Sequence, residues 1–203
     1  MKLMIFKKDS YYSAYLAGIS WLAYAYFFVI AKDAFFSALF LTLGGLFAVK
    51  VFTALYSILK EEDSGFAVTI LVLGVAGALG TMVHGGYDLA NAINPSMTAN
   101  LDLPSQVDPR GLLAFGITGL AIFKASYLMD KQSFSASKTK FFPHNLNFLG
   151  LFSGVLLMVI YVGRLVVLDP MHPVLKYSIL IEGFIVNPIW YLWLGYIFQK
   201  KLK

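Results

Sequence analysis

The sequence predicts an all-α membrane protein: one transmembrane domain, residues 1–203, built as a bundle of six membrane-spanning helices with both termini in the cytoplasm. The chain is 59% hydrophobic and 13% charged, whereas soluble domains carry about 25% charged residues. Six apolar runs are each about 20 residues long, which is enough for a helix to cross a bilayer. Basic residues are distributed unevenly between the two sets of loops, which is the pattern that orients membrane helices.

The predicted helices follow one another with short connections, so neighbours along the chain should pack antiparallel. Their expected positions are residues 11–31, 34–59, 65–92, 111–129, 146–168 and 175–198. Lysines precede the first run, as they precede a secretion signal, but its many tyrosines are atypical of a signal core and favour a retained helix. Three prolines in the loop 93–110 predict an ordered, extended cap over the outer face of the bundle. The loop 130–143 has the composition of a solvated linker.

The distribution of basic residues predicts the orientation. Ten lysines lie at the two termini and in the loops after the second and fourth helices. The opposite side has four basic residues, Lys32, Arg110, Arg164 and Lys176. Because cytoplasmic loops are enriched in lysine and arginine, we expect a multi-pass protein of the cell (plasma or inner) membrane with cytoplasmic termini.

The chain lacks the residues that several classes of chemistry require. The chain contains no cysteine, which excludes disulfides, thiol catalysis, iron–sulfur clusters and cysteine-ligated zinc. The three histidines do not converge in the predicted topology, so we expect no metal and no cofactor. The lysines form no aromatic-interleaved patch, so the lipid bilayer is an expected partner and nucleic acid is not. The sequence has no nucleotide-binding loop, nucleophile elbow or metalloprotease helix.

A polar stripe ends the third predicted helix. His84, Tyr87, Asp88 and Asn91 follow the spacing i, i+3, i+4 and i+7, which places the four side chains on one helix face. Polar groups are costly in hydrocarbon, so this polar stripe should face protein, water or a ligand. His84 and Asp88 lie one turn apart, and a histidine–carboxylate dyad of this kind suits proton transfer. A histidine inside a membrane helix can equally form only a structural hydrogen bond.

Ionisable residues of other helices are expected at the same depth. Counted from the helix ends at about 1.5 Å per residue, Arg164 and Glu182 lie in the same outer third of the bilayer as His84, with Arg110 near or above that level. The planar fork of arginine suits carboxylates and phosphates. These residues predict either a site for an anionic or polar ligand or internal ion pairs, such as Arg164 with Glu182 or Asp88.

Two further polar residues interrupt the apolar runs. Lys50 lies about 15 Å from the inner end of the second helix, beyond simple snorkelling, so we expect a water pocket, local thinning of the bilayer or a direction toward Glu182. Asn187 precedes Pro188, which frees a backbone carbonyl and should kink the sixth helix. Small residues between positions 74 and 81 should let another helix approach closely below the polar stripe.

Three segments resemble small six-span prokaryotic membrane proteins of the domain-of-unknown-function kind. They are His84–Asn91, Val107–Gly111 and Tyr161–Leu165, and this resemblance implies no activity. The pairs His84 and Asp88, and Asn187 and Trp190, are similar to the His-x-x-x-acid and Asn-x-x-Trp elements of sterol-isomerase-type EXPERA proteins. That resemblance implies a pocket for an amphiphile among the helices. The EXPERA family departs from this chain in having four spans and a further carboxylate, for which we place no counterpart here.

Three functions fit these predictions. The favoured one is binding or transport of a small polar, anionic or amphiphilic ligand at a site in the outer half of the membrane. The site residues would be His84, Tyr87, Asp88, Asn91, Arg110, Arg164, Glu182, Lys50 and Asn187. The second function is that of an enzyme acting on a lipid or isoprenoid, with His84 and Asp88 moving a proton. The third is that of an accessory subunit with a partner membrane subunit, in which the polar residues only form closed ion pairs.

Overall fold

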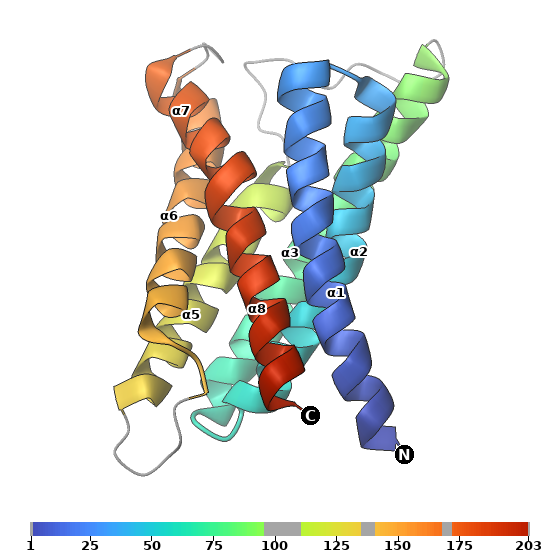
Figure 1. Ribbon diagram of the computed structural model, residues 1–203. Helices are drawn as coiled ribbons and strands as arrows, with labels where there is room; N and C mark the ends of the chain where they lie inside the picture. Colours follow the sequence, from blue (N-terminus) through green and yellow to red (C-terminus); the bar gives the residue numbers. More distant parts are fainter. Residues whose placement is uncertain (1, 96–110, 135–140, 168–171, 203) are drawn as a thin grey trace.

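Six helices of the structure are long and apolar enough to cross a membrane. The structure is a computed structural model, and it describes residues 2–95, 111–134, 141–167 and 172–202. The six candidate spans are Lys8–Ala31, Ala34–Leu59, Ser64–Ile93, Leu112–Gln132, His144–Val166 and Pro173–Lys201. The predicted all-α bundle, with six helices long and apolar enough to span a membrane, is therefore confirmed. Helix α1 begins and helix α8 ends at the same end of the bundle (Figure 1).

Three of the spans change from α-helical to π-helical geometry along their length. The elements are α1 (Lys2–Ala25), η1 (Tyr26–Ala31), α2 (Ala34–Leu59), α3 (Ser64–Ile93), η3 (Leu112–Ile117), α5 (Thr118–Phe134), α6 (His144–Val166), α7 (Pro173–Ile181), η4 (Glu182–Val186) and α8 (Asn187–Lys201). The π-helical segments are η1, η3 and η4. In a π-helix each backbone N–H bonds to the carbonyl five residues back, which widens the helix locally.

The helix ends differ from the prediction at several points. Helix α1 begins at Lys2, well before the predicted residue 11, and so includes Asp9. Helix α5 continues to Phe134, so the predicted linker 130–143 starts within a helix. Most of the predicted outer cap, residues 96–110, lies outside the described residues. Both α2 and α3 begin at an aspartate N-cap, as Asp33 and Asp63 each accept a backbone N–H three residues on at 2.9 Å.

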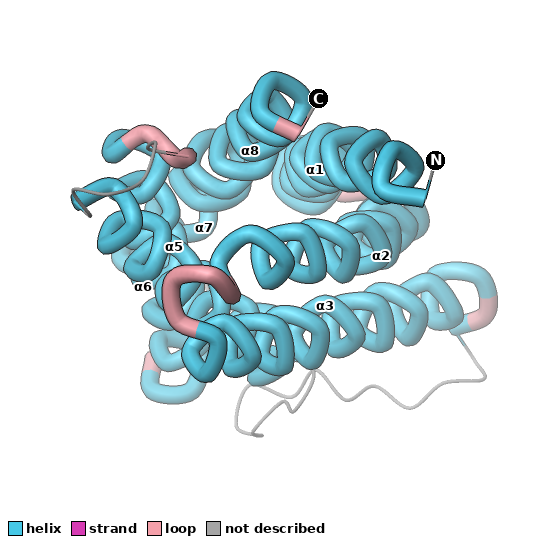
Figure 2. The backbone as a smooth tube through the Cα atoms, turned by 90° about the horizontal axis from the view of Figure 1, so that it is seen from below, coloured by secondary structure: helices cyan, strands magenta, loops and turns pink. Residues whose placement is uncertain are grey.

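The six spans form a ring in chain order. Each span packs on the next, α3 contacts both η3 and α5, and α8 returns to pack on α1. Figure 2 looks along this ring from the end that carries the termini, with α1 beside α8 and α2 between α1 and α3. Glycines bring the helices close: a Cβ at Gly45 would lie 2.7 Å from the carbonyl oxygen of Ala78, and one at Gly74 would overlap Phe52. Small residues therefore act as the packing surfaces that their spacing predicts.

The two ends of the bundle are packed differently. We call residues 2–20, 46–59, 64–78, 119–134, 144–152 and 188–201 the terminal half, and the other described helical residues together with Lys32 the cavity half. In the terminal half a Cβ at Gly18 would lie 3.0 Å from the carbonyl oxygen of Pro188, and the Tyr15 hydroxyl hydrogen-bonds Gln199 at 3.0 Å. Beyond this contact α1 and α7 diverge toward the opposite end (Figure 1).

Candidate functional site

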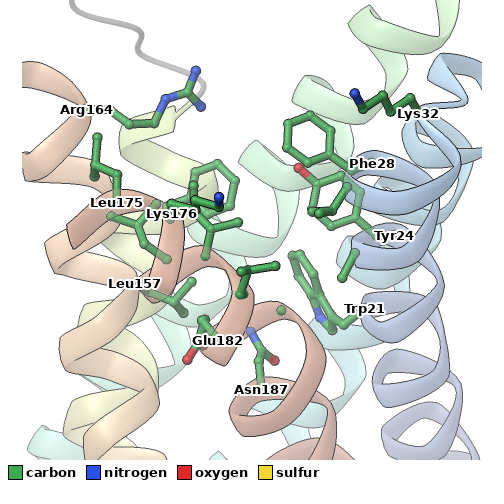
Figure 3. A pocket seen from close by; sticks show the side chains of 17 residues that line it. Trp21, Tyr24, Phe28, Lys32, Leu157, Arg164, Leu175, Lys176, Glu182 and Asn187 are labelled. Carbon is green, nitrogen blue, oxygen red and sulfur yellow. The ribbon is translucent and has the colours of Figure 1, made fainter. Parts of the chain in front are cut away.

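A cavity of about 510 Å³ lies between α1 and η1 on one side and α6, α7 and η4 on the other (Figure 3). Its size falls within the roughly 300–1,000 Å³ of small-molecule sites. Charged, apolar and polar residues line different parts of it.

Three cationic side chains line the cavity: Lys32, Arg164 and Lys176. All three are exposed, and Figure 3 shows Lys32 and Arg164 at the same end of the cavity, on opposite sides of it. Within the described ranges no carboxylate lies within 4.0 Å of any of them. The nearby carboxylate of Asp33 accepts the backbone N–H of Phe36 as the cap of α2. This end of the cavity therefore carries positive charge that is available to an anion.

Aromatic and aliphatic side chains form the walls. Trp21, Tyr24 and Phe28 follow one another along one face of α1 and η1, spaced i, i+3 and i+7. The rings of Trp21 and Tyr24 meet edge to face at 6.0 Å, and those of Tyr24 and Phe28 stack at 5.5 Å. Leu157 and Leu175 face them from α6 and α7 (Figure 3). The middle of the cavity is thus suited to hydrocarbon.

Two buried polar residues, Glu182 and Asn187, lie at the end of the cavity farthest from Lys32 and Arg164 (Figure 3). Each is only 3% exposed. The hydroxyl of Ser153 donates a hydrogen bond to Oε1 of Glu182 at 2.6 Å. The other carboxyl oxygen of Glu182 and the Oδ1 atom of Asn187 are buried, and neither accepts a hydrogen bond of standard geometry from the described residues. This end of the cavity, its floor, is therefore lined by buried polar residues.

The π-helical segment η4 gives Glu182 and Asn187 their common direction. In an α-helix, residues five apart point about 140° away from each other. Here the backbone N–H of Asn187 donates to the carbonyl of Glu182, the i to i+5 bond of a π-helix, which brings the two residues toward one face. Pro188 explains the position of η4, because proline lacks a backbone N–H and clashes with the carbonyl four residues back. The kink expected at Asn187 and Pro188 takes the form of this widened turn.

All three π-helical segments border the cavity. Phe28 comes from η1, Phe115 from η3 and Glu182 from η4. The chain leaves η1 at Lys32, whose φ of 52° is the only positive value at a non-glycine residue in the part of the chain that the structure describes. Such backbone conformations are uncommon and cluster at functional sites. The irregular backbone of the bundle is thus concentrated around one cavity.

The cavity brings together three of the residues that the sequence singled out: Arg164, Glu182 and Asn187. Arg164 and Glu182 do not form an ion pair, because they lie at opposite ends of the cavity (Figure 3). Arg110 lies outside the described residues.

The polar stripe lies behind the cavity wall. His84 is 7% exposed, and its Nε2 atom lies 3.3 Å from a carboxylate oxygen of Asp88. Phe115 lines the cavity, and its ring meets that of His84 edge to face at 6.2 Å. Neither the dyad nor the half-buried Tyr87 and Asn91 line the cavity. The stripe and the cavity therefore lie at one end of the bundle but in two separate places.

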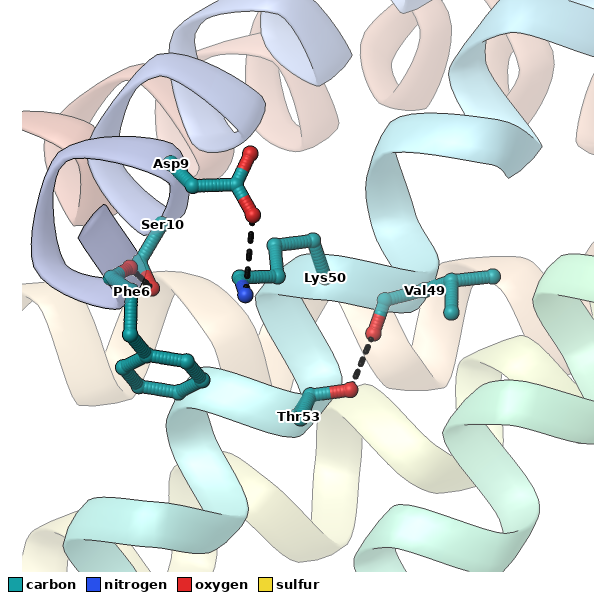
Figure 4. A network of polar contacts seen from close by, with 6 residues as sticks. All are labelled: Phe6, Asp9, Ser10, Val49, Lys50 and Thr53. Carbon is teal, nitrogen blue, oxygen red and sulfur yellow. Dashed lines mark hydrogen bonds and ion pairs between the residues drawn. The ribbon is translucent and has the colours of Figure 1, made fainter. Parts of the chain in front are cut away.

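Lys50 does not point toward Glu182, as was one expectation from the sequence. Its Nζ atom lies 2.8 Å from the carboxylate of Asp9 and 4.0 Å from the ring centroid of Phe6 (Figure 4). Both partners are on α1. The sequence reading began this helix at residue 11 and so left Asp9 outside it. Because α1 begins at Lys2, it carries an acid to the level of Lys50, and the lysine is neutralised within the terminal half.

Several lining residues were missed by the reading of the sequence. Lys32 and Lys176 counted there only as evidence for orientation. Trp21, Tyr24 and Phe28 had a detectable signal, since their spacing marks one helix face. Among the described residues no group of three or more histidine, aspartate or glutamate side chains is placed to hold a metal ion.

The fold and the cavity define a class: an α-helical, multi-pass membrane protein with an amphipathic internal cavity. No known protein family, curated protein or solved structure matches the chain. The family resemblances given above therefore stay predictions.

Proposed function

We propose that this protein binds an amphiphile with an anionic head group, and that the cavity in the cavity half is its binding site. The observation that carries the proposal is the order of the lining: cations at one end, then aromatic and aliphatic walls, then a buried polar floor. A ligand with a charged head and an apolar body matches that order. Transport of such a ligand across the membrane is a further step of the same proposal.

The cations favour an anionic head group. Lys32, Arg164 and Lys176 lie on the side that the positive-inside rule normally depletes of basic residues. Charges without carboxylate partners gain from an anion, and an arginine offers two parallel hydrogen bonds to a carboxylate or phosphate. Their position on the less basic side supports a binding role over a role in orientation.

The walls favour an apolar body. Moving one methylene group from water to an apolar surface contributes about 0.8 kcal/mol. Trp21 and Phe28 on one side and Leu157 and Leu175 on the other offer such a surface.

We place the protein in the cell membrane with both termini in the cytoplasm, on the strength of the ten lysines at that end. In this orientation the cations of the cavity lie on the outer side, and the ligand enters from there or from the outer leaflet.

The position of Trp21 in the cavity wall provides a direct test. Laurate brominated along its chain is titrated into the detergent-purified protein, because bromine quenches tryptophan fluorescence at close range. We expect saturable quenching, which the variant Trp21→Phe should lose. Arg164→Gln should raise the dissociation constant about tenfold or more, the equivalent of about 1.4 kcal/mol.

The matched control is Lys60→Gln, which removes an exposed cation at the other end of α2. It should leave the dissociation constant unchanged. Quenching that never saturates, or that persists fully in Trp21→Phe, contradicts the proposal.

An enzyme and an accessory subunit are the two alternative functions. The contact of 3.3 Å between His84 and Asp88 is the observation that favours an enzyme, and the substrate would then have to reach a dyad that lies behind Phe115. An accessory subunit with a partner in the membrane is favoured instead if the brominated laurate does not bind.

A further inference from the structure

The ring of helices around the cavity does not close between η1 and α7. Among the described elements, η1 packs on α1 and α2, and α7 packs on α6 and η4, whereas neither packs on the other. In the terminal half the ring is closed, because α8 packs on α1. Where the two sides separate, η4 still touches α1, since a Cβ at Gly183 would lie 3.1 Å from the side chain of Ala25. Beyond that contact the ring is open.

The cavity reaches the surface of the bundle at this opening. Phe28 lines the cavity from η1 and is nevertheless 52% exposed. Lys176 lines it from α7 and is also exposed. Both sides of the opening belong to candidate membrane spans, Lys8–Ala31 and Pro173–Lys201. An opening between two neighbouring spans on the outside of the ring faces the lipid.

The cations of the cavity lie at the depth of lipid head groups. Lys32 directly follows the span that ends at Ala31, and Arg164 and Lys176 lie within one turn of the ends of their own spans. At about 1.5 Å per residue, all three are within about 5 Å of a span end. The apolar walls lie deeper in the bundle (Figure 3). The lining therefore repeats the order of a single leaflet, with charge at the surface and hydrocarbon below.

We propose that the ligand is an anionic lipid of the surrounding leaflet, and that it enters the cavity sideways between η1 and α7. This inference rests on the proposed function and specifies its ligand class and its source. The lipid keeps its depth and orientation as it moves, so its chain passes from hydrocarbon to hydrocarbon. Its head group stays between Lys32 and Arg164, which lie on opposite sides of the cavity (Figure 3).

The first test measures which lipids reach Trp21 from the bilayer. The protein is reconstituted into phosphatidylcholine vesicles, in which a minor fraction of the lipid is chain-brominated phosphatidylglycerol or, separately, chain-brominated phosphatidylcholine. The difference in quenching between the wild type and Trp21→Phe isolates Trp21. We expect the anionic probe to quench it with about tenfold higher apparent affinity than the zwitterionic one. Arg164→Gln should remove most of this preference, and the control Lys60→Gln should keep it.

The second test closes the opening. The chain contains no cysteine, so Phe28→Cys with Ile179→Cys provides one pair of thiols, from η1 and α7, on the lining of the cavity. A bis-maleimide with an internal disulfide links the pair in detergent before reconstitution. Linking should abolish quenching by brominated phosphatidylglycerol, and reduction of the linker should restore it.

The matched control ties the same two spans together in the terminal half. Tyr15 and Gln199 are hydrogen-bonded at 3.0 Å, and the same linker between Tyr15→Cys and Gln199→Cys should leave the quenching unchanged. Each double variant is compared with itself before and after linking, so a folding defect is visible in the unlinked sample. The comparison of the two lipids in the wild type needs no variant of the opening.

The outcomes separate this inference from the proposed function. If brominated laurate added from water quenches Trp21 saturably but brominated phosphatidylglycerol in the bilayer does not, the lipid is ruled out and the binding of an anionic amphiphile stands. Equal quenching by the two brominated lipids, or quenching that survives the link between η1 and α7, also overturns the inference. If neither laurate nor lipid quenches Trp21, the proposed function fails as well.

Discussion

The terminal half and the cavity half are built from the same six spans, yet they are packed in opposite ways. Every apolar residue of the described chain with no exposed surface lies in the terminal half, apart from Ala114. Trp190, Tyr191 and Phe198 are examples, all from α8. The cavity half instead holds the three π-helical segments, the left-handed Lys32 and a cavity of about 510 Å³.

The difference separates a closely packed part of the molecule from the part that holds the cavity. Helices in a bilayer associate through close packing, since lipid is as apolar as the side chains themselves. The terminal half supplies that packing. The cavity half keeps irregular backbone, which reduces stability and persists only when the rest of the structure supports it.

The largest expected effect tests how much the buried packing of the terminal half contributes to stability. Trp190 is completely buried, so Trp190→Ala leaves a large void and should lower the free energy of unfolding by about 3 kcal/mol. Thermal unfolding in detergent, followed by circular dichroism, measures it. Ile189, the adjacent residue, is 43% exposed, so Ile189→Ala should cost under about 0.5 kcal/mol. Equal losses for the two variants would remove the distinction between buried and lipid-facing positions.

The second prediction concerns the cavity half, where Ser153 donates to Glu182. Ser153→Ala removes the hydroxyl donor of the buried carboxyl and should lower the free energy of unfolding by about 2 kcal/mol. In the double variant Ser153→Ala with Glu182→Leu, both polar partners are gone, and most of that loss should be recovered. The same thermal unfolding measures both. A double variant as unstable as Ser153→Ala would show that Glu182 contributes to stability and not only to the site.

The sequence was sufficient for the fold because the length and apolar character of each span are local properties. The start of α1 was missed because polar residues such as Asp9 do not end a helix where it leaves the hydrocarbon. The π-helical segments were missed for another reason: only Pro188 near η4 leaves a trace in the sequence. The widening of η1 and η3 has no comparable signal.

The site was only partly predictable for a geometric reason. Counting residues at about 1.5 Å each gives the depth of a side chain but not the direction in which its helix face points. Depth placed His84, Arg164 and Glu182 at one level. Only the packing around Phe115 shows that His84 lies behind the wall while the other two line the cavity.

The smallest expected effect compares the two ends of α2 directly. Lys32 precedes this helix with φ 52°, and Lys60 caps its other end with φ −60°. Glycine tolerates the left-handed region that strains other residues, so Lys32→Gly should raise the free energy of unfolding by about 0.5–1 kcal/mol. At Lys60, where the conformation is helical, glycine should lower it by a similar amount.

The sign of the effect is what matters, since the two variants exchange the same residues at opposite ends of one helix. Thermal unfolding gives the sign, and titration with laurate then separates strain from charge. Lys32→Gly should be more stable than the wild type and yet bind laurate more weakly, because it removes a cation from the cavity. If it were less stable, the left-handed turn would not be strained, and the cavity half would differ from the terminal half in its packing alone.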